Sequence, residues 1–267
     1  MLQLCSVAEH SCLHSSQDAA NWTDLKHMYR PGQQRRISLI PLFAVSQQWR
    51  TAMNLPRYLL LITALLSASL HAEDRPVTFN GCVIQPESNC ANVDLRGADL
   101  SNQDLRKMNL ANANLTGANL RHANLDLANL ENANLTGAIL NRATLQQANL
   151  RLAVLTDAQL VAVQAWGLFA QGARFEGANL TAANLEFARL SGAKLKGAEL
   201  TAANLEMAWL SKADLNHANL TDANLQEGKF NDASFANAIL TGSRRHYATF
   251  QGTYMDGCLD CPVDWEH

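Results

Sequence analysis

Four cysteines lie in two pairs whose spacing could support thiol chemistry. Cys258 and Cys261 have the CxxC spacing of redox motifs and of half a zinc site, and Cys82 and Cys90 lie far upstream. A redox CxxC lies at a helix N-terminus beside a βαβ unit, where the helix dipole lowers the pKa of the first thiol. A four-cysteine zinc site would require the two pairs to meet. The elements between the pairs therefore decide which chemistry is open to them.

Those elements follow a period of five residues. Leu or Phe occupies every fifth position from Leu95 to Phe250 except at Ala165, Ala170 and Arg245, and the residue two before it is nearly always Ala. In an α-helix this period would spread the leucines around the cylinder, and in a flat strand it would put them on alternating faces. They converge on one core only if each pentapeptide forms one short side of a polygonal coil.

Runs such as 113–117 (Ala-Asn-Leu-Thr-Gly) and 133–137, with the same residues, resemble the A(D/N)LXX pattern of the pentapeptide-repeat family. The resemblance implies an all-β fold, a right-handed, four-sided parallel β-helix with about twenty residues per coil. We therefore predict a β-helix solenoid of about eight coils over residues 93–252. Both ends of a solenoid need caps, which we assign to residues 73–92 and 253–267.

This rod would keep the two cysteine pairs apart. At a rung spacing of about 4.8 Å, eight coils extend for roughly 38 Å, whereas a disulfide needs Cα atoms within about 7 Å. We therefore predict the disulfides Cys82–Cys90 and Cys258–Cys261, each fastening a cap, and exclude a four-cysteine zinc site within one molecule. No βαβ unit is visible that would support a redox role for the CxxC pair. A metal half-site shared between two molecules stays open.

The other ionisable residues give catalysis little support. Glu186 and Glu206 are twenty residues apart, so they should stack at about 5 Å, close enough to perturb each other's pKa. A carboxylate pair on a convex, wet wall lacks the cleft that glycosidases use. His122, His217 and His246 fall in different columns, and none forms an evident pair with a nucleophile. We predict a protein that is not an enzyme and has no cofactor or metal.

Residues twenty apart should share a face, so the outward residues can be read as columns. Asparagine dominates the position before each central Leu, and stacked amides can hydrogen-bond along the axis as in other cross-β ladders. The Asn columns are Asn109, Asn129 and Asn149; Asn184, Asn204 and Asn224; and Asn114 with Asn134.

One column and its flank carry aromatic and basic residues instead. Their alternation predicts cation–π stacking along the axis, and an exposed apolar patch usually marks a partner site. Alternatively, these side chains only cover one another, or a terminal segment folds back over them. The column holds Phe169, Arg189, Trp209 and Lys229, and the flank holds Trp166, Phe187 and Met207.

A compositional break adjoins this patch without changing the five-residue count. Ala165 and Ala170 are small where Leu is usual, and Val163 and Leu168 are bulky where Ala is usual. The larger residues can fill the space left by the smaller ones. We expect a local distortion here, with Trp166 near the surface.

The first 72 residues differ from the repeat. Residues 53–72 have the short basic start, apolar run and small-residue end of a secretory signal, with cleavage expected after Ala72. The apolar run is too short to span a bilayer comfortably. Residues 1–52 have no hydrophobic period, and we interpret them as an unstructured extension from a misplaced start. The rival is a twin-arginine signal at Arg35 and Arg36, but polar residues separate that pair from the apolar run.

The charge balance and the signal together indicate an exported protein. The whole chain carries −3 and residues 1–72 carry +3, which leaves −6 for residues 73–267. Direct nucleic-acid binding is therefore disfavoured, and no stable membrane insertion is expected after cleavage. We predict a structural or protein-binding scaffold in a Gram-negative cell envelope, periplasmic or secreted. It would be cytoplasmic if Met1 is the true start and the signal is unused.

The sequence does not identify the protein partner, and bare coil ends would allow two copies to associate end to end. The family resemblance also implies an alternative, a rod-shaped acidic DNA mimic that binds DNA gyrase or topoisomerase and gives quinolone resistance. That role requires a cytoplasmic, usually dimeric protein with a strongly acidic surface. Here the carboxylates are interleaved with basic residues, among them Arg174, Arg189, Lys194, Lys196 and Lys212.

Overall fold

The computed structural model describes residues 77–262. The predicted extension (1–52) and signal peptide (53–72) lie outside these residues, as do parts of both predicted caps. The described part begins with an antiparallel hairpin of β1 (Thr78–Phe79) and β2 (Cys82–Val83). Its two-residue turn is Asn80-Gly81, with φ of 47° and 79°, and Asn-Gly is the pair that such tight hairpin turns favour.

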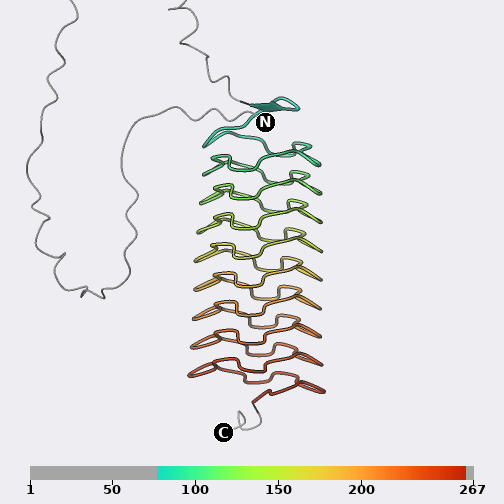
Figure 1. Ribbon diagram of the computed structural model, residues 1–267, viewed down its shortest axis with the longest axis vertical. Coiled ribbons are helices and arrows are strands. Elements are labelled where there is room, and N and C mark those ends of the chain that lie inside the picture. The colour runs from blue at the N-terminus through green and yellow to red at the C-terminus, as the bar shows by residue number, and fades with distance from the viewer. Residues whose placement is uncertain (1–76, 263–267) are drawn as a thin grey trace, which may run out of the picture. The chain divides into compact units, whose positions relative to one another are not determined.

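After the hairpin the chain forms a β-helix with a register of twenty residues. Every fifth residue makes a parallel bridge to the residue twenty positions later, from Asn89↔Asn109 to Ile239↔Leu259. Figure 1 shows the resulting coils stacked along one axis from the hairpin to the red end. The five-residue period predicted this architecture, and the ladder extends beyond both ends of the predicted range 93–252.

The asparagine in each repeat shapes the turn that follows it. At Asn109, the side-chain Oδ1 accepts a hydrogen bond of 3.2 Å from the Ala111 N–H, and the Ala113 N–H donates to the Leu110 carbonyl at 3.0 Å. Asn112, third in this turn, has a φ of 57°. A positive φ at that position is typical of type II turns and favours Gly or Asn. Each pentapeptide therefore ends in a corner, and the chain turns without an inserted loop.

The core is a column of Leu and Ala side chains, as the sequence predicted. Leu115 and Ala113 are fully buried, and the same alternation continues along the repeat. Near the C-terminal end phenylalanines replace leucines. Phe230 stacks on Phe250 at 5.1 Å between ring centroids and packs edge-on against Phe235 at 5.6 Å.

The predicted distortion around Ala165 and Ala170 is wrong. The bridges Gln164↔Asn184 and Phe169↔Arg189 keep the register of their neighbours. Val163 is fully buried and Leu168 is 2% exposed, so the exchange of large and small residues takes place inside an unchanged coil. The volume is conserved, which is the kind of core change that proteins tolerate best. Trp166 does lie near the surface, 37% exposed.

The structure pairs the cysteines within each end. Cys82 is bonded to Cys90 with Cα atoms 5.4 Å apart, and Cys258 to Cys261 with Cα atoms 5.8 Å apart. The second bridge encloses Asp260, whose carbonyl accepts a hydrogen bond from the Arg245 guanidinium. Arg245 occupies an inward position where other coils have Leu, so this contact places its charge at the end of the core. No helix within residues 77–262 is long and apolar enough to cross a membrane.

Candidate protein-binding face

One side of the β-helix changes character halfway along its length. Its first four rungs are asparagines, Asn89, Asn109, Asn129 and Asn149, joined by amide hydrogen bonds of 2.8, 3.1 and 3.0 Å. Asn149 then bridges to Phe169, and the amide ladder ends. A second predicted ladder, over Asn184, Asn204 and Asn224, also forms, at 3.4 and 2.9 Å. Asn114 and Asn134 instead accept hydrogen bonds from the neighbouring Thr116 and Thr136 hydroxyls.

Beyond Asn149 the column becomes a stack of alternating rings and cations. The Arg189 guanidinium carbon lies 5.1 Å from the centroid of the Phe169 ring and 5.5 Å from that of the Trp209 ring. Lys229 Nζ lies 5.5 Å from the Trp209 ring, and the Arg151 guanidinium carbon lies 5.4 Å from the Phe169 ring. The predicted cation–π alternation is therefore confirmed. Its first member, Arg151, was missed because it reaches in from a corner and not from the column.

The corner beside this column carries further apolar side chains. Trp166 and Phe187 pack edge to face with ring centroids 5.8 Å apart. Phe187 is 42% exposed and Trp209 is 48% exposed. We call the whole surface the aromatic–cationic face. It comprises Trp166, Phe169, Phe187, Arg189, Met207, Trp209 and Lys229, together with Arg151.

Two residues of this face have a costly backbone conformation. Phe187 and Met207 have φ of 57° and 54°, at the turn position that Gly or Asn occupies in many other coils. A bulky side chain in this left-handed region is uncommon and costs about 1 kcal/mol. The same conformation recurs at this turn position along the repeat, for example at Leu127 and Leu152, so it belongs to the fold and does not distinguish this face.

The cations of the stack have no acidic partner among residues 77–262. Within this range the ion pairs are Asp94–Arg96, Asp104–Arg106, Glu87–Lys107 and Arg174–Glu176. The side chains of Arg189 and Lys229 also make no hydrogen bond with another described residue. Their N–H groups are therefore available to an external acceptor.

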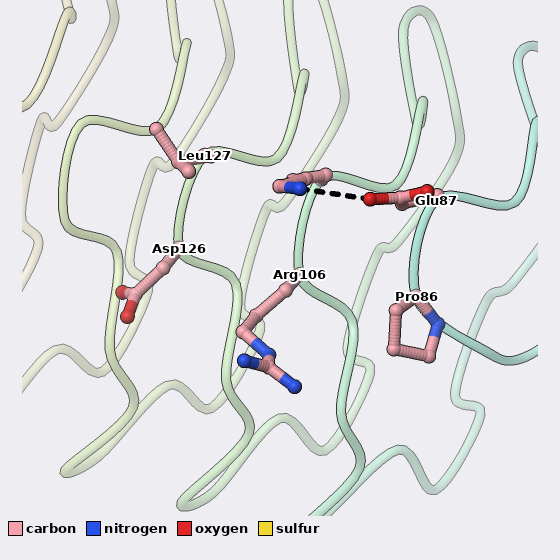
Figure 2. A pocket seen from close by; sticks show the side chains of 6 residues that line it. Pro86, Glu87, Arg106, Asp126 and Leu127 are labelled. Carbon is pink, nitrogen blue, oxygen red and sulfur yellow. Dashed lines mark hydrogen bonds and ion pairs between the residues drawn. The ribbon is translucent and has the colours of Figure 1, made fainter.

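A shallow pocket lies on the same corner near the N-terminal end (Figure 2). Its volume is about 480 Å³, and it is lined by Pro86, Glu87, Arg106, Lys107, Asp126 and Leu127. The charged groups there already have partners. Lys107 donates to Glu87 at 2.8 Å, as the dashed line in Figure 2 marks. Arg106 pairs with Asp104, and Asp126 accepts a hydrogen bond from the Gln146 N–H. This pocket thus offers a ligand few free groups.

Hydrogen bonds hold several carboxylates near the N-terminal end in their ionised form. The pKa values of Asp94 and Asp104 lie below the ordinary value of an aspartate, chiefly because the Arg96 and Arg106 side chains donate hydrogen bonds to them. The Lys107 ammonium lowers the pKa of Glu87 in the same way. All three carboxylates are exposed to water. They are surface pairs and not the shifted groups of a buried catalytic site.

The other candidates for chemistry do not form a site. Glu206 accepts a hydrogen bond of 2.9 Å from Asn224, and the His246 ring lies against Tyr247 at 3.8 Å between centroids. Among residues 77–262 no three His, Cys, Asp or Glu side chains are grouped as metal ligands would be. The CxxC cysteines are bonded to each other within a coil end, with no helix in the described residues to activate them.

The solved structures that are similar to this chain include pentapeptide-repeat proteins. HetL, involved in heterocyst differentiation regulation in the cyanobacterium Nostoc sp. strain PCC 7120, is 26% identical and covers 78% of this chain and 97% of its own (TM-score 0.36). A pentapeptide repeat protein from the Arabidopsis thaliana thylakoid lumen is 34% identical over 36% of this chain and 66% of its own (TM-score 0.35).

QnrB1, a plasmid-mediated fluoroquinolone resistance protein, is 18% identical over 63% of this chain and 89% of its own (TM-score 0.37). A search of curated protein sequences gave no significant match. The family model for pentapeptide repeats matches eight copies, over residues 88–126, 128–163, 158–197, 178–216 and 218–257. The matched segments agree with the twenty-residue bridge register and the buried Leu and Ala columns. The chain belongs to the pentapeptide-repeat family.

Proposed function

We propose that this protein is a non-enzymatic scaffold that binds another protein through its aromatic–cationic face. The observation that carries the proposal is the switch within one column, from the hydrogen-bonded ladder at Asn129 and Asn149 to the half-buried Phe169, the exposed Trp209 and cations without an acidic partner. Exposed aromatic residues with arginine are the typical composition of interface centres.

We place this activity in the cell envelope, in a mature protein that begins at Glu73 and has about eight coils. The apolar run and small-residue end of residues 53–72 support export. N-terminal sequencing of protein purified from fractionated cells tests it. Glu73 as the first residue in the envelope fraction is the expected result. An intact Met1 species in the cytoplasm would contradict export.

A DNA-mimic role is a weaker proposal for this chain. Such a surface should present uninterrupted acidic columns, whereas one column here runs Arg174, Lys194, Asp214 and the aromatic–cationic face has Arg189 and Lys229. A gyrase supercoiling assay separates the two proposals. We expect the purified protein neither to inhibit gyrase nor to protect gyrase from a quinolone.

The binding proposal is tested with a matched pair of variants. Phe187→Asn with Trp209→Asn converts the face to the residue type of the amide ladder. Ile239→Asn, half a coil away and 38% exposed, makes a similar change on another side. Affinity capture from the envelope fraction should recover the same protein with wild type and Ile239→Asn, and lose it with the double variant. Equal recovery by all three proteins would refute the proposal.

A further inference from the structure

We infer that the ligand of the aromatic–cationic face is an acidic, proline-rich peptide segment in the polyproline II conformation, with a carboxylate at every third residue. The inference rests on the proposed function and specifies its partner. It follows from three features of the face, namely the spacing of its cations, the free donors of Arg189 and Lys229, and the rings between them.

The spacing is set by the coil. Arg189 and Lys229 are forty residues apart, which is two rungs of the bridge ladder and about 9.6 Å. Arg151 comes from the coil before Phe169 and Arg189 from the coil after it, and both side chains contact the Phe169 ring. These two cations are therefore also two rungs apart along the axis. The face therefore presents Arg189 and Lys229 in the column on either side of Trp209, and Arg151, which also donates to Gln171 at 3.3 Å, reaches the Phe169 ring from the neighbouring corner.

A polyproline II helix matches this interval. It has three residues per turn and rises about 3.1 Å per residue, so every third side chain points the same way about 9.3 Å further on. A β-strand advances about 10 Å in three residues, but then the third side chain faces away. An α-helix returns to one face after seven residues, about 10.5 Å further on, and is about 10 Å wide. Polyproline II is thus the closest match among the regular conformations.

The chemistry of the two surfaces also agrees. Arg189 and Lys229 have no acidic partner and no side-chain hydrogen bond among residues 77–262, so a carboxylate would not displace an existing pair. Between them Trp209 is 48% exposed, and proline rings pack on aromatic side chains in known polyproline II recognition. A peptide that repeats Glu-Pro-Pro would place carboxylates on the cations and prolines on the rings.

The flanking carboxylates limit the ways in which such a peptide can bind. Glu186 and Glu206 lie at the corner beside Arg189 and Trp209, and Glu206 already accepts a hydrogen bond from Asn224. They repel acidic groups from the corner and leave the line of cations as the one favourable track. A ligand with charges at the wrong interval would put a carboxylate over a ring or near these glutamates.

The test uses two fluorescein-labelled twelve-residue peptides of identical composition, (Glu-Pro-Pro)4 and (Glu-Glu-Pro-Pro-Pro-Pro)2. Their charge is the same and only the spacing differs. Fluorescence polarisation at low ionic strength, with the full-length mature protein, should show about tenfold tighter binding of (Glu-Pro-Pro)4. Arg189→Gln with Lys229→Gln should reduce this binding about tenfold. Arg244→Gln, an exposed cation on another side, should leave it unchanged, and circular dichroism checks that each variant is folded.

Equal affinity for the two peptides, or no binding of either, would overturn the inference. So would displacement by heparin with no effect of the Arg189→Gln and Lys229→Gln changes, because this would indicate a general polyanion site elsewhere. The result for this ligand and the result for the proposed function can be told apart. Loss of the captured envelope protein in the Phe187→Asn and Trp209→Asn variant, with no preference between the peptides, would support the face and reject this ligand.

Discussion

Gly228→Ala is expected to destabilise the protein although most repeats have Ala at that position. A Cβ at Gly228 would lie 2.6 Å from Cε2 of Phe230 and 3.0 Å from the Leu225 carbonyl oxygen. Phe230 cannot easily move, because it is fully buried and packs between Phe250 and Phe235. Overpacking of this kind costs about 1–3 kcal/mol. The glycine is therefore the residue that makes room for a phenylalanine in a leucine site.

The sign of this effect is diagnostic. Gly228 does not have a positive φ, and at such positions Gly→Ala normally stabilises a protein by about 0.4–1 kcal/mol. Urea unfolding of Gly228→Ala, Phe230→Leu and the double variant gives the coupling between the two sites. The double variant restores the common Ala and Leu pair and should recover most of the stability lost in Gly228→Ala. A single variant as stable as wild type, or more stable, would refute the packing argument.

Three further predictions concern the ladder, the strained turn and acid pH. Asn129→Ala removes the hydrogen bonds with Asn109, Asn149 and the Glu131 N–H, and should lower the unfolding free energy by about 1–3 kcal/mol in urea titrations. An unchanged unfolding free energy would show that the ladder does not stabilise the fold. Phe187→Asn should change the unfolding free energy in urea titrations by less than about 1 kcal/mol, because Asn adopts a positive φ more readily than Phe and this offsets the lost Trp166 contact; a larger loss would make Phe187 structural. Asp94 and Asp104 have lowered pKa values when folded, so their stabilisation is present above about pH 4 and is lost as pH falls through the lowered values. Hydrogen-exchange protection in residues 89–109 should then fall more between pH 5 and pH 3 than in residues 209–229; an equal fall would contradict it.

The five-residue count predicted the architecture because it fixes which side chains share a rung. It placed Phe169, Arg189 and Trp209 in one column, and the bridges confirm that register. The same count predicted amide ladders, which form where no threonine hydroxyl occupies the side-chain oxygen that the next Asn would donate to. Asn114 and Asn134 do not pair because their side-chain oxygens bond to threonines two residues later.

What the count could not predict depends on side-chain volume and direction. The distortion around Ala165 was wrong because Val163 and Leu168 exchange volume with the small residues inside a regular coil. Arg151 was missed because a corner side chain can point toward either adjoining side, and its direction toward Phe169 is a matter of rotamer. The positive φ of Phe187 required backbone dihedrals, although the recurrence of Gly at this position of the repeat was a signal in the sequence.

Site-specific photo-crosslinking tests most directly whether the aromatic–cationic face is where the partner binds. Benzoylphenylalanine is placed at Thr249, which is exposed and bridges Lys229 in the column of the face, or at Ile239, half a coil away. Irradiation of cells should give a discrete crosslinked adduct from position 249 and none from position 239. An adduct from position 239 alone, or equal adducts from both positions, would contradict the account.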